Sequence, residues 1–175
     1  MHKAFVPASV ALLMVADGIA LAAQDRSTLK VPGGGLSFAE FKGYETWQPV
    51  GPSQVPDGIK QIAANDVMMR AYRAGLPAKG KTFPEGSKVV KIEWALKKDP
   101  VSPYPVNVPG ELMSVSFIEK DSKRFPKTHG WAYAQFLYDP KTKALKANGT
   151  GAECGYACHT VVAGQDYIFT AYPPR

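Results

Sequence analysis

The stretch 87-SKVVKIEWAL-96 decides the fold, because its side chains alternate in character from one residue to the next. A β-strand places successive side chains on opposite faces of a sheet. The two sets are Val90, Ile92 and Trp94 on one face, and Val89, Lys91 and Glu93 on the other. The preceding residues 83–86 (FPEG) have the composition of a turn. The stretch therefore predicts a strand that begins just after a turn.

Further strand-like stretches follow along the chain. Residues 111–120 (ELMSVSFIEK) alternate again, with Leu112, Ser114, Ser116 and Ile118 on one face and Met113, Val115, Phe117 and Glu119 on the other. Residues 130–139 (GWAYAQFLYD) predict a third strand, and a turn at 139–143 leads back. The run 166–172 (DYIFTAY) is rich in aromatic and β-branched residues and predicts a further short strand. The proline-rich residues 100–110 are expected to form a loop.

Helix signals precede these strands. Residues 37–40 have the Ser-x-x-Glu spacing of a capping box, which predicts a helix over residues 38–47. Asn65 or Asp66 can cap a second helix over residues 67–74. In the second segment Val67, Ala71 and Ala74 lie on one side of the expected helix, with Met68 and Tyr72 beside them.

The order of these elements indicates the fold class. Residues 50–59 (VGPSQVPDGI), between the two helices, have the composition of a turn. Early helices followed by hairpin-linked strands predict an α+β fold, mainly an antiparallel β-sheet with two or so N-terminal helices. The chain shows no internal repeat, and residues 36–175 are expected to form a single domain.

The N-terminus has the pattern of a secretory signal peptide over residues 1–22. A basic start and a mostly apolar stretch lead to the Ala-Leu-Ala sequence at residues 20–22, which is a cleavage pattern. Pro7 and Asp17 interrupt the apolar stretch, so it makes a poor transmembrane helix, although an uncleaved membrane anchor is the alternative. Residues 23–35 are expected to be a flexible lead-in. Export places the cysteines in an oxidising compartment.

The chain is basic, with a formal net charge of +6 at pH 7. Such a charge favours acidic partners or a membrane surface. The lysines and arginines are nevertheless scattered, and the densest run, KDSKRFPK at residues 120–127, is typical of a solvated loop. The sequence therefore predicts no nucleic-acid partner.

The stretch 153-ECGYACHTVV-162 carries the chemistry. It holds the two cysteines of the chain, Cys154 and Cys158, and His159 follows directly. A c-type haem is attached through two cysteine thioethers, with the next histidine as iron ligand, usually in the pattern Cys-x-x-Cys-His. Here three residues separate the cysteines, and the wide φ range of Gly155 can accommodate the additional one. A disulfide between the cysteines is the alternative, whereas a zinc site lacks a fourth ligand.

Four stretches, in this order, resemble the cytochrome P-460 family: NDVMMRAYRAG (65–75), FPEGSKVVKIEW (83–94), GWAYAQF (130–136) and CGYACHTVVAGQDYIFTAY (154–172). The resemblance covers roughly residues 36–173. It implies a small periplasmic haem protein, often a homodimer, built largely of antiparallel β structure, with a five-coordinate haem. In catalytic members a lysine is bonded to a haem meso carbon. These members oxidise hydroxylamine to nitric oxide or nitrous oxide and pass electrons to a soluble acceptor cytochrome.

The resemblance also implies roles for particular residues. Cys154 and Cys158 match the thioether positions of haem c, and His159 matches the proximal ligand of the iron. Lys91 is the expected cross-linking lysine, and Lys88 is the second choice. Without the resemblance, Lys91 has the pattern of an ordinary solvated strand lysine.

A distal acid is expected from the strand pattern. Glu119 continues the face of Val115 and Phe117, and a carboxyl at the end of an apolar face is partly desolvated, which raises its pKa and suits proton transfer. The alternative is that Glu119 begins an exposed turn, and Glu93 is the second candidate acid. His129 is expected to be a loop histidine, with a second axial ligand as the alternative.

Three functions remain open on the sequence. The first is a haem-dependent hydroxylamine oxidoreductase. The second is a non-catalytic protein that binds nitric oxide or another gas, like the related β-sheet cytochromes c-prime, which lack the lysine bond. The third is a disulfide-stapled periplasmic domain without haem. A bond between Lys91 and the haem would distinguish the first function from the second. Haem attachment at Cys154 and Cys158, rather than a disulfide, would exclude the third.

Overall fold

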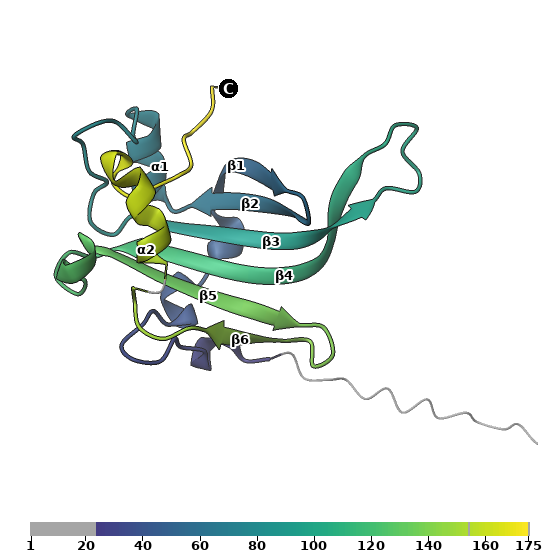
Figure 1. Cartoon of the computed structure of the whole chain (residues 1–175), viewed down its shortest axis with the longest axis horizontal. Helices are drawn as coiled ribbons and strands as arrows, with labels where there is room; N and C mark the ends of the chain where they lie inside the picture. Colours follow the sequence, from purple (N-terminus) through teal and green to yellow (C-terminus); the bar gives the residue numbers. More distant parts are fainter. Residues whose placement is uncertain (1–23, 154, 175) are drawn as a thin grey trace, which may run out of the picture.

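The computed structural model describes residues 24–153 and 155–174. The predicted signal peptide and Cys154 lie outside the described residues. The central element is a six-stranded antiparallel sheet in which each strand pairs with the next along the chain (Figure 1). Its strands are β1 (Gln48–Val55), β2 (Gly58–Ala64), β3 (Lys88–Lys98), β4 (Asn107–Lys120), β5 (Trp131–Asp139) and β6 (Ala144–Asn148).

The alternating stretches form the centre of this sheet, which confirms the α+β prediction with its antiparallel sheet. In β3, β4 and β5 the residues Lys91, Ser116 and Gln135 stand opposite one another, and Val89, Ile118 and Tyr133 form the next row on the same face. The ends of β3 and β4 project beyond the other strands (Figure 1). Strand β4 begins at Asn107, so the proline-rich loop is shorter than its sequence predicts.

One face of the sheet is covered by short 3-10 helices, η1 (Arg26–Thr28), η2 (Phe38–Phe41) and η3 (Tyr44–Thr46). Phe41 stacks on Phe117 of β4 with ring centroids 4.1 Å apart. The predicted capping box is present at Ser37, but the single helix expected over residues 38–47 is wrong. Lys42 leaves the helical conformation at the end of η2, and Gly43, left-handed at φ +83°, begins η3.

The segment expected to be a flexible lead-in also packs on this face. Val31 is fully buried, and the side chain of Gln24 both accepts from and donates to the backbone of Leu145 in β6. These contacts hold the segment before η2 against the edge of the sheet.

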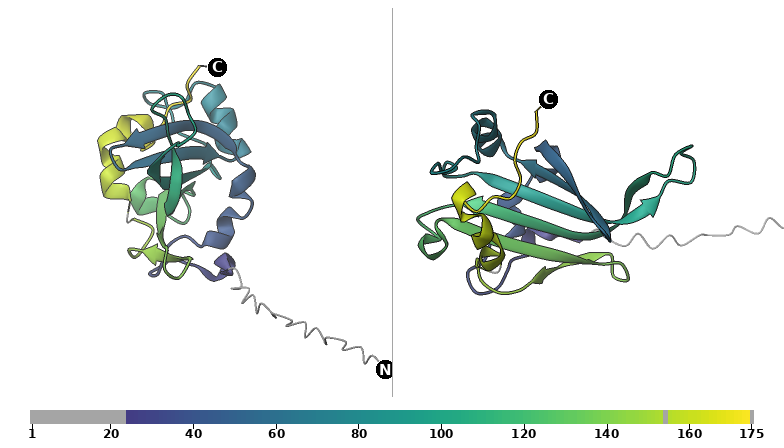
Figure 2. Two further views of the ribbon diagram at one scale, coloured as in Figure 1. Left: turned by 90° about the vertical axis from the view of Figure 1, so that its right-hand side faces the viewer. Right: turned by 45° about the horizontal axis from the view of Figure 1, so that its top comes forward.

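The other face carries α1 (Asp66–Arg73) and the C-terminal helices α2 (Tyr156–His159) and η5 (Thr160–Gln165). Figure 2 shows the C-terminal helices and the N-terminal 3-10 helices on opposite sides of the sheet. Asn65 is the N-cap of α1, as predicted, and its side chain accepts from the backbone of Met68. No helix in the described part of the chain has the length and apolar character needed to cross a membrane.

Two other predictions are wrong. Residues 50–59, expected to be a turn, form most of the β1–β2 hairpin, because β1 lies at the sheet edge, where prolines are tolerated. Residues 166–172, expected to be a strand, are not one: Asp166 and Tyr167 adopt φ +50° and +63°. Left-handed residues break the extended backbone that a strand requires.

Candidate functional site

A cavity of about 700 Å³ lies between the sheet and the C-terminal segment. Its volume lies within the range of small-molecule and cofactor sites. The sheet contributes the face that carries Val89, Lys91, Ser116 and Ile118, and α2 contributes Cys158 and His159. The cavity therefore brings together the motif near residue 159 and the strand near residue 91, which are far apart in the sequence.

His159 is held by one short hydrogen bond and two aromatic neighbours. Its Nδ1 lies 2.6 Å from the carbonyl oxygen of Tyr167. Its ring lies 4.6 Å from that of Tyr133 and 4.9 Å from that of Phe169. Because Nδ1 donates to a carbonyl, Nε2 is the ring nitrogen left to bind a metal.

The electrostatic surroundings of His159 favour its neutral form. Burial lowers the pKa of the imidazole; the hydrogen bond to Tyr167 opposes this shift, and the positive charge of Lys91 adds to it. A neutral imidazole is the form that binds a metal, so the surroundings prepare His159 for coordination.

Cys158 precedes His159 on α2 and also lines the cavity. It is an exposed free cysteine, so its sulfur is available for a thioether bond. Cys154, the other expected thioether position, lies outside the described residues.

Gly155 serves a different purpose from the one expected. Its φ of −97° is available to any residue, so it makes no use of the wide range of glycine. A Cβ at this position would instead lie 2.8 Å from the side chain of Tyr133. The glycine lets the backbone before α2 approach β5 closely, next to His159.

Lys91 lies on the cavity face of β3, as expected for a residue that contacts a bound group. Its Nζ is 3.6 Å from Oε2 of Glu93, and Lys60 of β2 is 3.5 Å from the other oxygen of the same carboxylate. Lys60 also lines the cavity. Sequence reasoning missed Lys60 because only the pairing of β2 with β3 brings it opposite Glu93.

Glu119 and Lys88 lie on the opposite face of the sheet, and the structure thereby corrects two expectations. The two residues are direct cross-strand partners, with Lys88 Nζ 3.3 Å from Glu119 Oε1. Arg124 approaches the second oxygen at 3.7 Å. Burial raises the pKa of Glu119, as predicted, but its carboxyl faces η2 and cannot act in the cavity. Glu93 is the acid on the correct face.

Two buried hydroxyls in the cavity were also missed. Within the part of the chain that the structure describes, neither Tyr72 Oη nor Ser116 Oγ has a hydrogen-bond partner. Both residues line the cavity, and buried polar atoms are seldom left without partners. These atoms, together with Nε2 of His159 and the thiol of Cys158, fit a bound group with an iron ligand position and polar edges. The strand pattern placed Ser116 with Ile118, but their common cavity depends on the C-terminal segment.

His129 belongs to the connection between β4 and β5, beside the cavity. It stacks on Tyr167 at 5.1 Å and on Tyr156 at 6.2 Å, and it lines a neighbouring hollow. A side-chain hydrogen bond with Tyr156 raises the pKa of Tyr167 to about 12. His129 is therefore a loop histidine in an aromatic stack, and its ring contacts the residue whose carbonyl holds His159.

Comparison with known proteins adds one finding. A family model with the description "Cytochrome P460" matches residues 41–170, which include every residue that lines the cavity. No curated protein matches the chain.

Proposed function

This chain belongs to the cytochrome P-460 family and is a haem protein, and we propose that it is a periplasmic haem c enzyme that oxidises hydroxylamine to nitric oxide or nitrous oxide. The observation that supports the proposal is the cavity, which joins His159 and Cys158 on α2 with Lys91 on β3. These are a metal ligand, an attachment point and a reactive amine.

In this proposal each residue has one task. His159 would bind the iron through Nε2, because its Nδ1 donates to the Tyr167 carbonyl. Cys158, with Cys154, carries the thioether bonds. When bound, haem supplies an iron that can take the substrate nitrogen and accept its electrons. We propose Lys91 as the residue that bonds to the macrocycle, as the catalytic members of the family imply.

Glu93 takes the place that the sequence had suggested for Glu119. Oxidation of hydroxylamine removes protons as well as electrons, so a carboxylate beside the cavity has a task. Glu93 lies between the ammonium groups of Lys60 and Lys91, which hold its carboxylate beside the cavity.

The test uses protein exported together with haem-maturation machinery. A red-shifted and broadened Soret band in the reduced state, with oxidation of hydroxylamine by an added electron acceptor, supports the proposal. An ordinary c-type spectrum in the wild type contradicts the lysine bond. A colourless protein contradicts haem attachment and supports a disulfide between Cys154 and Cys158 instead.

Gas binding without turnover is the second candidate, and one observation favours it. The cavity has an apolar strip, with Val89 and Ile118 on the sheet and Ile168 on the C-terminal segment. An apolar pocket suits a small neutral ligand such as nitric oxide. A haem protein that binds nitric oxide, does not oxidise hydroxylamine and has an ordinary c-type spectrum would support this function over the first.

The remaining features of the proposal rest on the sequence and the family. From the predicted signal peptide we propose a periplasmic location, where a soluble cytochrome would accept the electrons. The family resemblance implies a homodimer. Fractionation of the host cell tests the first feature, and light scattering of the purified protein tests the second.

A further inference from the structure

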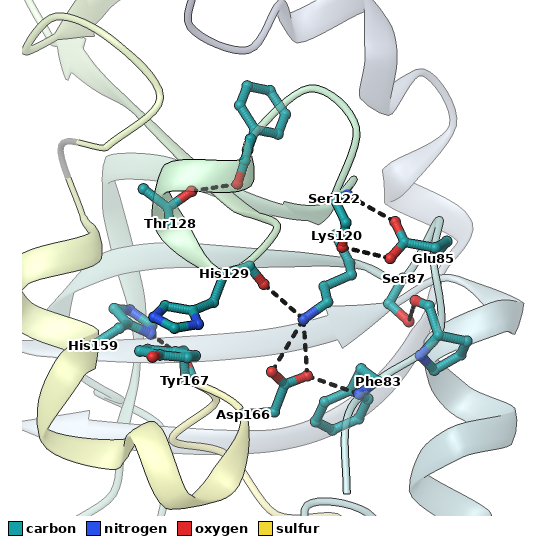
Figure 3. A network of polar contacts seen from close by, with 12 residues as sticks. Phe83, Glu85, Ser87, Lys120, Ser122, Thr128, His129, His159, Asp166 and Tyr167 are labelled. Carbon is teal, nitrogen blue, oxygen red and sulfur yellow. Dashed lines mark hydrogen bonds and ion pairs between the residues drawn. The ribbon is translucent and has the colours of Figure 1, made fainter.

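We infer that the buried Lys120–Asp166 ion pair is a positioning device for His159. It holds the backbone turn at Asp166 and Tyr167, and this turn presents the Tyr167 carbonyl to His159 Nδ1 (Figure 3). Lys120 and Asp166 are therefore positioning residues that act through Tyr167. The iron-binding consequence rests on the proposed function, whereas the orientation of His159 does not.

The ion pair is well satisfied although it is buried. The Lys120 and Asp166 side chains are 6% and 5% exposed, and Nζ lies 3.0 Å from Oδ1. Nζ also donates to the His129 carbonyl at 2.9 Å and lies 4.9 Å from the centre of the Trp131 ring. Asp166 Oδ2 accepts from the backbone N–H of Phe83 at 2.7 Å. Two distant segments, at Lys120 and at Phe83, thus hold one carboxylate.

The backbone at this carboxylate needs such support. Asp166 and Tyr167 are consecutive residues with positive φ, and neither is glycine. Aspartate tolerates the left-handed region better than most residues, but tyrosine at φ +63° persists only where surrounding contacts impose it. The ion pair holds the first residue, and the stacking of Tyr167 on His129 holds the second.

The strained turn has one visible effect at the site. The carbonyl of Tyr167 lies 2.6 Å from His159 Nδ1. Such a bond fixes the tautomer and the ring direction of a metal-binding histidine and raises its basicity as a ligand. An extended backbone at residues 166 and 167, as the sequence pattern predicts, would turn this carbonyl elsewhere. The left-handed turn therefore orients the Tyr167 carbonyl, and through it the ring of His159.

The sheet offers a matched control for the ion pair. Lys88 and Glu119 form an ion pair at 3.3 Å on the opposite face, with side chains 21% and 9% exposed. Its neighbours are Glu40 and Arg124. Glu119→Gln therefore removes one charge from a largely buried pair without contact with the turn that holds His159.

The test starts with the haem-free exported protein. Nitrogen NMR of the histidine rings reports which nitrogen carries the proton, and the variant His159→Gln assigns the His159 signals by their loss. We expect wild type and Glu119→Gln to show a single Nδ1–H tautomer that exchanges slowly with water. Asp166→Asn keeps a residue that tolerates the left-handed turn but removes the charge, so it should give mixed tautomers and fast exchange. A wild type without the protected Nδ1–H overturns the inference.

Lys120→Met is the second variant. It removes the ammonium group but leaves Asp166 and its hydrogen bond from the Phe83 N–H in place. It therefore replaces Asp166→Asn in the test if that variant does not fold. A His159 signal unchanged from wild type in either folded variant overturns the inference. A change of the same size in Glu119→Gln also overturns it, because the effect would then follow from general loss of stability.

The haem-loaded protein gives an independent readout. We expect the iron–histidine stretching band of the reduced protein to move to lower frequency and broaden in Asp166→Asn but not in Glu119→Gln, since a weaker Nδ1 bond makes a weaker ligand. An identical band in both variants and wild type overturns the inference while the proposed function stands. A wild type that binds no haem contradicts the proposed function, and the NMR test still decides the inference.

Discussion

Lys88 and Lys91 lie three positions apart on β3 and face opposite sides of the sheet. Lys88 donates to the carbonyl of Glu40 at 2.8 Å, on the side covered by the 3-10 helices. Lys91 lines the cavity that contains His159. The separation follows from strand geometry, since an odd number of steps along a strand changes the face. Of these two lysines of β3, Lys91 is the one placed to reach a group bound in the cavity.

Replacement of Lys91 by alanine tests this difference. We expect Lys91→Ala, loaded with haem, to show an ordinary c-type absorption spectrum and to lose hydroxylamine oxidation. Lys88→Ala, the control on the opposite face, should keep the wild-type spectrum and activity, and Lys60→Ala tests the second lysine of the cavity. A Lys91→Ala spectrum that is identical to a red-shifted wild-type spectrum would exclude Lys91 as the cross-linking residue.

The close approach at Gly155 predicts a local loss of stability. A Cβ at this position would lie 2.8 Å from the side chain of Tyr133, so Gly155→Ala must displace the ring or the backbone. We expect a loss of about 1–3 kcal/mol in the free energy of unfolding. Gly164→Ala is the control, because its Cβ would have no neighbour within 4 Å. Urea denaturation measures both, and equal effects would show that the packing at Gly155 is not tight.

The side chain of Asn65 joins α1 to β3. Its Oδ1 accepts from the N–H groups of Met68 and Lys88 at 3.0 and 3.1 Å, and its Nδ2 donates to the Gly86 carbonyl at 2.8 Å. Asn65→Ala should therefore cost about 2 kcal/mol, at the upper end for an N-cap. Asn65→Asp keeps the acceptors and should cost less. Equal losses in the two variants, measured by thermal unfolding, would assign the effect to the Nδ2 donor alone.

Glu119 predicts how stability depends on pH. Burial raises the pKa of its carboxyl above 4.5, and Lys88 only partly opposes the shift. Above pH 4.5 the unfolded chain has lost this proton while the folded chain retains it. The folded state then binds more protons, so the contribution of Glu119 to stability falls as pH rises from 4.5 through the raised pKa.

Glu119→Gln should remove this contribution, and urea denaturation at pH values on both sides of 4.5 measures the change. Glu85 is the contrasting residue, because hydrogen bonds from Ser122 lower its pKa. Its contribution is present above the ordinary pKa and is lost as pH falls, so Glu85→Gln should change the pH profile in the opposite direction. Profiles that change in the same direction would contradict the opposed shifts.

Local patterns in the sequence determined much of this fold. Alternation in residues 87–96 and 111–120 predicted β3 and β4, because the two-residue repeat of a strand involves only neighbouring residues of the sequence. The capping box at Ser37 and the N-cap at Asn65 were also visible, since a cap involves residues only a few positions apart. The resemblance named Lys91 and His159, and the structure brings both to one cavity.

The tertiary structure decided what depends on distant partners. The pairing of Lys88 with Glu119 places that acid outside the cavity, and the pairing of Glu93 with Lys60 supplies another. Alternation separates the two faces of one strand, but it does not show which face another segment will cover. The turn at residues 166–167 depends on Lys120, which is 46 residues away. Its left-handed backbone is stabilised by a buried charge, and no local propensity in the sequence predicts that contact.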